Sequence, residues 1–385
     1  MNETKKVTVL SLGTDGRGIA RDENGAVLFV KHLLPHETGL VKVTAKHKNF
    51  SEAILVQLER KASLSDRIYP PPCRYFERCG GCTLQHLAEQ KQTEWKIVWF
   101  FETLRRIGQW PAENIKHAQK IFAISFLKKN FYRRKVILHF DGQHLGFKEF
   151  HTHKIIDIEN CTIAHPKINT LISFLQKEIL NIYANNKHQK ISLDIQLSLD
   201  EKENKIALEI LSKKHYEKTF QLKLQNILAK NNLVTLNQEV EVKTPFLTHF
   251  TTHRSSFVQP HMDCIFPYSF FISDSIASYL KTLNKSDLKA WDLFCGSGLF
   301  TGIPYFIGKK CNIKIDCLGI EGVHEAIHSL NKNYQRIPCI QGTCKDVHAF
   351  LKDSSFLPEQ CPDIVILDPP RTGLGIESTK KLVEL

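Results

Sequence analysis

The sequence has no continuous apolar run of about 18 residues, the length that a membrane-spanning helix requires. Its first residues, MNETKKVTVL, also lack the apolar core of a secretory signal peptide. We therefore expect a cytoplasmic protein with no membrane partner. In that compartment the 11 cysteines are expected to be reduced thiols or metal ligands rather than disulfides.

Acidic residues are too few to balance the basic ones. The 385 residues include 40 Asp and Glu against 52 Lys and Arg, which gives a formal net charge of +12. An excess of this sign favours a polyanionic partner such as RNA, because neutralising phosphates supplies much of the affinity for nucleic acids. A basic soluble protein without such a partner is the alternative, and charge alone does not choose between them.

Residues 290–300, AWDLFCGSGLF, predict a buried strand that ends in an acid and turns through Gly296 and Gly298 into a helix. Two features of phosphate-binding turns are missing. Thr301 stands where a dinucleotide site has its third glycine, and neither glycine is followed by the Lys-Ser/Thr of a P-loop. A pocket for a nucleoside without phosphates remains, and S-adenosylmethionine (SAM) is the commonest such cofactor. The alternative is a glycine turn that binds no nucleoside.

Three acids, Asp292, Glu321 and Asp368, each follow a predicted strand of the same region. A parallel sheet carries its chemistry at the carboxyl ends of its strands. Glu321 also has the spacing from the glycine turn at which a βαβ unit offers a carboxylate to ribose hydroxyls. The three acids are therefore candidate ligands of one cofactor pocket.

The pattern of strands and helices divides the chain into three regions. Short strands at 7–10, 27–30, 39–43 and 53–56 predict a small OB-like β-barrel, a fold that often binds RNA. An amphipathic helix at 84–107 and hairpins within 136–147 and 191–210 follow. From about residue 256 helices and strands alternate, which is typical of a doubly wound Rossmann-like sheet. The expected helices cover 274–283, 300–307, 324–333 and 347–352, and the last strands cover 338–342 and 364–367.

We therefore predict a multidomain α/β protein. An RNA-binding barrel covers 1–62, a central, mainly antiparallel α+β domain covers 63–255, and a cofactor domain covers 256–385.

A compact group of cysteines, Cys73, Cys79 and Cys82, follows a proline run. Cys161 is the candidate for a fourth thiolate. Four thiolates suit either tetrahedral zinc or an iron–sulfur cluster, and the spacing does not separate the two.

Two basic segments are candidate RNA contacts. Arg17 lies on a glycine-rich turn of the predicted barrel, and Arg133, Arg134 and Lys135 follow an aromatic residue on a predicted strand. A solvated charged edge is the alternative for the second segment.

With these motifs in view, the chain resembles the RNA uracil-C5 methyltransferases, most closely the bacterial branch that makes 5-methyluridine in 23S rRNA. The barrel looks like that branch's TRAM domain, residues 257–259 match its glutamine motif, and DPPR at 368–371 matches its Asp-Pro-Pro-Arg. Leu299 departs from the asparagine usual there, and Thr343 from a residue that is usually polar or acidic. The resemblance implies four [4Fe–4S] ligands, Cys73, Cys79, Cys82 and Cys161. It also implies a SAM and target-base pocket formed by Gln259, Phe294, Gly296, Gly298, Leu299, Glu321, Thr343 and Asp368.

The resemblance further implies that a cysteine adds to C6 of uracil before the methyl group is transferred to C5. In the family this cysteine and a general-base glutamate follow the Asp-Pro-Pro-Arg motif, and the sequence ends at Leu385 before either. Cys295 lies on the cofactor turn, where packing is the expected role. We therefore expect this 385-residue chain, a monomer, to bind RNA and SAM without transferring a methyl group. A fragment of an active enzyme, a non-catalytic remnant, and a tRNA rather than an rRNA substrate all remain open.

Overall fold

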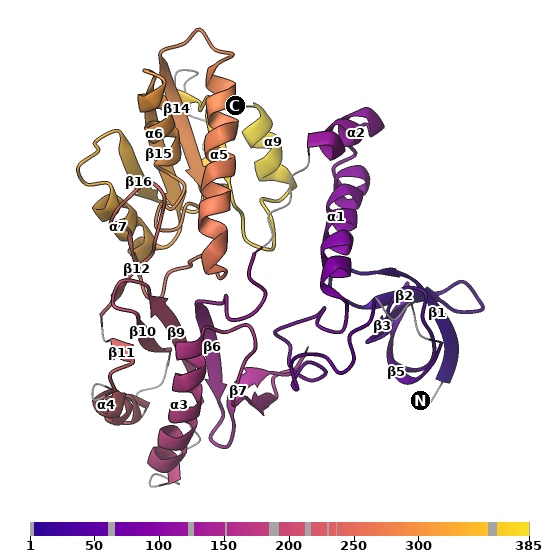
Figure 1. Ribbon diagram of the computed structural model, residues 1–385. Helices are drawn as coiled ribbons and strands as arrows, with labels where there is room; N and C mark the ends of the chain where they lie inside the picture. The colour runs from indigo at the N-terminus through magenta and orange to yellow at the C-terminus, as the bar shows by residue number, and fades with distance from the viewer. Residues whose placement is uncertain are drawn as a thin grey trace. The chain divides into compact units, whose positions relative to one another are not determined.

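The computed structural model describes residues 4–60, 66–121, 127–150, 152–184, 192–211, 217–228, 231–235, 237–352 and 360–384 (Figure 1). The chain forms two compact units, residues 1–124 with 144–158, and residues 125–143 with 159–385. No helix in the described ranges is long and apolar enough to cross a membrane. The predicted boundary between residues 62 and 63 lies outside the described residues, and the three-domain division stays a prediction.

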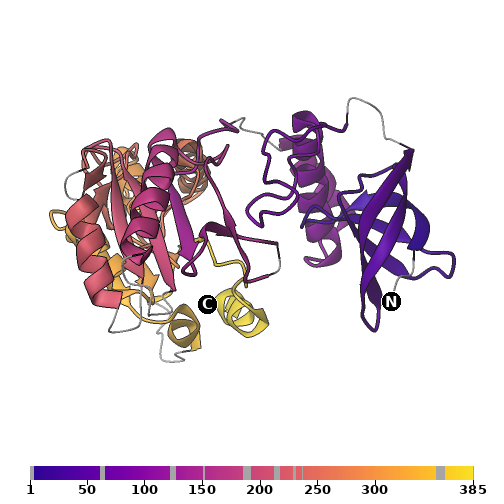
Figure 2. The ribbon, with the colours of Figure 1, turned by 90° about the horizontal axis from the view of Figure 1, so that it is seen from below.

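The first unit opens with a closed five-stranded barrel (Figure 2). Its strands are β1 (Thr4–Leu12), β2 (Gly18–Arg21), β3 (Val27–Lys31), β4 (Thr38–Lys46) and β5 (Phe50–Arg60), in the order β1-β2-β3-β5-β4. Alternate residues of β1 and β4 point inward, and Val9 and Val41 are fully buried in the barrel core. The sequence predicted four of these strands and missed the short β2.

The rest of the first unit contains α1 (Glu89–Arg106), α2 (Ala112–Ile121) and the antiparallel pair β7 (Leu145–Lys148) and β8 (Ile155–Asp157). The helix predicted from residue 84 begins five residues late, because the backbone at Ala88 is extended, with ψ 143°. Leu87 instead pairs with Arg67 in an isolated bridge and packs against Leu12 and Leu34.

The second unit begins with a sheet in the order β11-β10-β9-β6, formed by β6 (Lys135–Phe140), β9 (Leu193–Asp200), β10 (Lys205–Leu211) and β11 (Val234–Thr235). The second of the two predicted hairpins is confirmed, because β9 pairs antiparallel with β10 and Leu197 lies opposite Leu208. Helices α3 (Pro166–Ala184) and α4 (Glu217–Leu228) and the pair β12 (Glu239–Glu241) and β13 (Thr251–His253) complete this part.

The remainder of the second unit is a parallel sheet in the order β16-β15-β14-β17. Its strands are β14 (Asp287–Leu293), β15 (Lys314–Glu321), β16 (Ile340–Cys344) and β17 (Ile364–Leu367). The helices are α5 (Ile265–Leu280), α6 (Ile303–Lys310), α7 (His324–Asn333), α8 (Val347–Lys352) and α9 (Ile376–Glu384), and a 3₁₀ turn η1 (Met262–Cys264) precedes α5.

The bounds of α7, α8 and β17 agree with the prediction, and two differences are instructive. Helix α5 begins well before the predicted residue 274, because its first turns are apolar on all sides and expose Phe266, Phe270 and Phe271, so no amphipathic period marks them. The prediction did not include α9.

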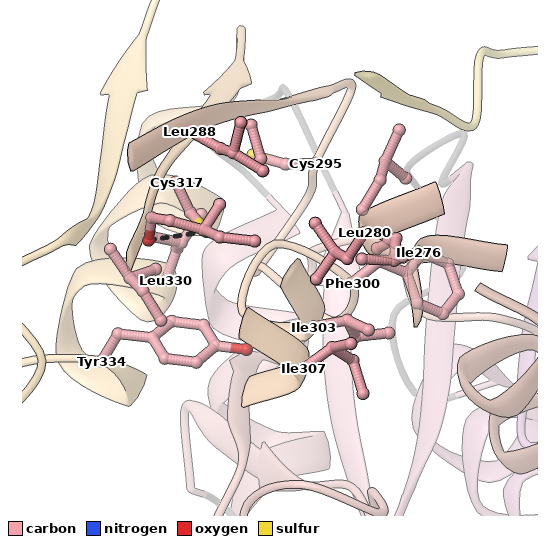
Figure 3. Packing of buried hydrophobic residues seen from close by; sticks show 14 of the residues in the cluster. Ile276, Leu280, Leu288, Cys295, Phe300, Ile303, Ile307, Cys317, Leu330 and Tyr334 are labelled. Atoms are coloured by element: carbon pink, nitrogen blue, oxygen red, sulfur yellow. Dashed lines mark hydrogen bonds between the residues drawn. The ribbon is translucent and has the colours of Figure 1, made fainter. Parts of the chain in front are cut away.

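Both faces of the parallel sheet carry an apolar core, as a doubly wound fold requires. On one face Leu288 and Ala290 of β14 pack with α5, α6 and α7, a cluster that Figure 3 shows from close by. On the other face Trp291 and Leu293 pack with α8. Strand β17 forms one edge of the sheet and leaves Leu367 41% exposed.

Candidate cofactor site

The strand register brings the three predicted acids to one face of the sheet. Asp292 on β14 lies opposite Gly319 of β15 and Ile366 of β17, two positions before Glu321 and Asp368. Because side chains alternate along a strand, all three point to the face that α5, α6 and α7 cover. The prediction that they end neighbouring strands is confirmed.

The turn after β14 has the backbone that its glycines permit. Gly296 and Gly298 have φ of 54° and 86°, and Phe294 reaches 61° in spite of its side chain. A Cβ added at Gly298 would lie 2.7 Å from Leu330 Cγ, so the turn also needs glycine for space. Tyr334 Oη fixes this point by donating a hydrogen bond to the Gly298 carbonyl at 2.9 Å.

Glu321 braces the same turn. Its Oε2 accepts a hydrogen bond from Gly296 N at 3.2 Å, and its Oε1 accepts one from Val323 N at 3.0 Å. The carboxylate therefore holds the end of β15 and the glycine turn in register. Its role toward a ribose stays a prediction.

Gln259 and Asp368 are in contact although they lie 109 residues apart in the sequence. Gln259 Nε2 donates a hydrogen bond to Asp368 Oδ2 at 2.7 Å. Both line one pocket, whose walls are four phenylalanines and the glycine turn. The lining residues are Val242, Phe250, Thr252, Phe257, Val258, Gln259, Asp292, Phe294, Cys295, Gly296, Ser297, Leu299, Phe300 and Asp368.

Asp368 also borders a second, larger hollow. With Phe300 it closes an apolar groove of about 680 Å³ between α5 and β17, where Tyr268 and Phe271 form part of the wall. Asp368 thus stands between two hollows, which is a position from which one carboxylate can contact two ligands.

Burial changes the acid–base properties of the groups under the pocket. Desolvation raises the pKa of Asp292 to about 7, and nearby Asp368 and Glu321 act in the same direction, while the hydrogen bond from Thr301 acts against it. Desolvation also raises the pKa of Cys264 to about 11 and that of Cys295 well above its ordinary range. Neither thiol is therefore a ready nucleophile near neutral pH.

Most of the predicted pocket residues line the pocket, and three of them do not. Gly298 lies on the turn itself, Glu321 braces the turn through Gly296 N, and Thr343 lies on β16, opposite Ile320 in the register. Sequence reasoning missed Thr252, whose hydroxyl lies 2.6 Å from that of Ser297. It also missed Asn333, whose side chain donates to the Thr251 and Ser297 carbonyls. Both come from short or distant elements, which have no local motif.

The structure corrects the predicted RNA contacts of the second basic segment. Arg134 is 2% exposed, and its Nη2 lies 3.2 Å from Glu201 Oε2. The Lys135 ammonium donates to the carbonyls of Arg254, Ser255 and Ser256, and burial lowers its pKa to about 8. These two cations hold the fold together instead of facing RNA.

Arg17 is also less available than predicted. Its guanidinium pairs with Asp15 at 2.7 Å and with Glu52 at 3.1 Å, and it lies over the Phe29 ring. The side chain is only 15% exposed. Arg133 is half-buried and donates from Nε to the Lys135 carbonyl at 3.3 Å.

The four predicted cluster ligands are all half-buried, with Cys73, Cys79 and Cys82 in the first unit and Cys161 in the second. Within the described ranges no group of three or more His, Cys, Asp or Glu side chains is arranged to hold a metal ion. The cluster therefore stays a prediction. Next to the cysteine loop His86 is 2% exposed, and neither of its ring nitrogens has a hydrogen-bond partner among the described residues.

Comparison with known proteins finds matches to the barrel and to the chain as a whole. A family model described as the TRAM domain matches residues 2–56. A protein named as an uncharacterized RNA methyltransferase, from Caldanaerobacter subterraneus subsp. tengcongensis, is 27% identical over 421 residues, covering 100% of this chain and 87% of that protein. A protein of Shewanella woodyi named 23S rRNA (uracil(1939)-C(5))-methyltransferase RlmD is 28% identical over 382 residues. The match covers 93% of this chain and 79% of the Shewanella protein.

The TRAM match and the names of these relatives support a relationship to the RNA uracil-C5 methyltransferase family. A further protein named RlmD, from Chromohalobacter salexigens, is 35% identical over 192 residues, which is 49% of this chain and 38% of that protein. Within this family reading, the glutamine motif and the Asp-Pro-Pro-Arg motif are the two sequence signals that the structure joins by a direct hydrogen bond.

Proposed function

We propose that the pocket at the end of the parallel sheet binds SAM. The observation that carries the proposal is the character of the pocket in a chain of net charge +12. The side chains of Asp292 and Asp368 and four phenylalanine rings line it, and its lining includes no Lys, Arg or His. Carboxylates and aromatic faces attract cations and repel phosphates, and SAM carries a sulfonium and an ammonium group.

Different residues would bind different parts of SAM and of the target base. Glu321, at the end of β15, is placed to accept hydrogen bonds from ribose hydroxyls, although its oxygens also brace Gly296 and Val323. Phe294, Leu299 and the glycine turn would pack against the nucleoside. Gln259 and Asp368 would hold the polar edge of the target base, since the two side chains offer donors and acceptors side by side.

We further propose that the RNA is 23S rRNA and the target atom C5 of a uridine. The names of the relatives and the TRAM domain support an RNA substrate of this kind, and the net charge favours a polyanion. A tRNA uridine is the alternative that the same observations allow.

The chemistry requires a thiolate, because C5 of uracil becomes nucleophilic only after a thiolate adds at C6. Cys295 is unsuited to that role: it is buried, its pKa is raised, and its sulfur lies against Gly319 in the sheet. The attacking thiolate would thus have to be a cysteine other than Cys295. A second candidate function is binding of RNA and SAM without methyl transfer.

We also propose Cys73, Cys79, Cys82 and Cys161 as ligands of a [4Fe–4S] cluster, which would brace the fold. The family resemblance supports this assignment. So does the buried His86 beside the loop, whose ring nitrogens have no hydrogen-bond partner among the described residues and so have capacity for an additional group. Anaerobically purified protein is expected to be brown, with about four irons per chain. Stoichiometric zinc without visible absorption would rule the cluster out.

Calorimetry of SAM binding tests the main proposal. Wild-type protein is expected to bind SAM, and Glu321→Gln should bind at least about tenfold more weakly, since the carboxylate both braces the turn and accepts hydrogen bonds. Asp346→Asn, in the loop that follows β16, is the surface control and should leave the affinity unchanged. Methyl transfer from labelled SAM to unmodified 23S rRNA then separates the two candidate functions.

A further inference from the structure

Asp292 is a buried carboxyl group, and no cation lies beside it in the part of the chain that the structure describes. It is 3% exposed, and its one hydrogen bond among the described contacts comes from Thr301 Oγ1 at 2.6 Å. The other polar groups that act on it are two acids at the ends of the adjacent strands, two buried thiols and a buried phenol: Glu321, Asp368, Cys295, Cys317 and Tyr334.

An ionised carboxylate in such surroundings is costly, because no cation among the described residues neutralises it and two further acids lie at the neighbouring strand ends. The neutral form is therefore favoured until a positive charge enters the pocket. The raised pKa of Asp292, about 7, agrees with this geometric argument. It places the change of charge near neutral pH, where a ligand can shift it.

We propose that Asp292 makes the pocket selective for the sulfonium cofactor over its thioether product by giving up a proton when the sulfonium binds. The inference rests on the proposed SAM site. The carboxyl O–H bond breaks, the proton passes to solvent, and the carboxylate then faces the positively charged ligand. S-adenosylhomocysteine (SAH) has a neutral thioether in place of the sulfonium, so Asp292 keeps its proton when SAH binds.

The consequence is a binding preference that depends on pH. Affinity for SAM rises with pH up to about 7 and then levels off, because above that value Asp292 is already ionised. Affinity for SAH gains nothing from this ionisation. Product is therefore held less firmly than substrate, which favours its release.

Titration calorimetry tests this in two buffers of different ionisation enthalpy, where the difference in heat gives the number of protons released. At pH 7 wild-type protein is expected to release about half a proton more with SAM than Asp292→Asn does. The ratio of the affinities for SAM and SAH should also be roughly tenfold smaller in the variant than in wild type. Protons exchanged by the amino group of the ligand itself remain in the variant and cancel in the comparison.

Asp292→Asn has the shape of the protonated side chain and should fold. Thr301→Val provides a second measurement, because losing its hydrogen bond removes an interaction that favours the ionised form, which moves the pH of maximum proton release upward. Equal proton release by wild type and Asp292→Asn would overturn the inference, and so would SAM binding without release at pH 7. A protein that binds neither SAM nor SAH would instead overturn the proposed function.

Discussion

Gln259 and Asp368 lie 109 residues apart in sequence, and their side chains are joined by a hydrogen bond of 2.7 Å. The loop before α5 supplies one partner and the end of β17 supplies the other. The bond is exposed, so it contributes little to folding, yet it fixes the one carboxylate that borders both the proposed cofactor pocket and the apolar groove.

Replacing Gln259 with Leu should separate binding from stability. Because the bond is exposed, the free energy of unfolding is expected to change by less than about 0.5 kcal/mol. Affinity for the target RNA should fall roughly tenfold, since Asp368 loses its orienting donor. Denaturant unfolding and RNA titration on the same samples check this, and a large loss of stability would show that the bond has a structural role instead.

Replacing Gly298 with Ala should destabilise the second unit. The new Cβ would meet Leu330 at 2.7 Å with the backbone held at φ 86°, whereas at Gly373, where φ is 74°, a Cβ has open space. Gly298→Ala is therefore expected to cost about 1–3 kcal/mol more than the control Gly373→Ala in urea unfolding. Equal costs would mean that the turn relaxes around the added methyl group.

The raised pKa of Asp292 also predicts how stability depends on pH. The folded protein holds this proton up to about pH 7, while the unfolded chain releases it near the ordinary aspartate pKa of 3.8. The contribution of this group is therefore full below the unfolded pKa and is lost as pH rises toward 7, by up to about 1.4 kcal/mol per pH unit. Urea unfolding from pH 5 to pH 8 should show this slope in wild type and a flatter one in Asp292→Asn. Parallel slopes would contradict the prediction.

Removing the Arg134 side chain should damage the fold more than RNA binding. Arg134→Met leaves Glu201 buried without its cation and is expected to cost about 3–5 kcal/mol. Arg133→Gln, one residue earlier and only half-buried, should cost no more than about 1 kcal/mol. Adding Glu201→Gln to Arg134→Met should recover part of the loss. A stable Arg134→Met variant with weakened RNA binding would restore the original interpretation of this segment.

Much of the fold and of the site could be predicted from the sequence because the signals are local. The alternating strands of the barrel, the bounds of α7 and α8 and the glycine turn at 296–298 each follow from the residues within one element. The acid at the end of each strand of the parallel sheet likewise follows from strand endings, since parallel strands share one carboxyl edge.

The tertiary structure alone decided which charges are buried and what they contact. In the sequence Arg134 and Lys135 form a basic stretch. In the structure Arg134 pairs with Glu201, and Lys135 donates hydrogen bonds to the carbonyls of residues 254–256. Those partners come from distant parts of the chain. The same holds for Asp292, whose proton depends on two acids and a hydroxyl that only the strand register brings close. A sequence fixes how many charges a protein has, whereas their solvation and their partners depend on distances that arise only on folding.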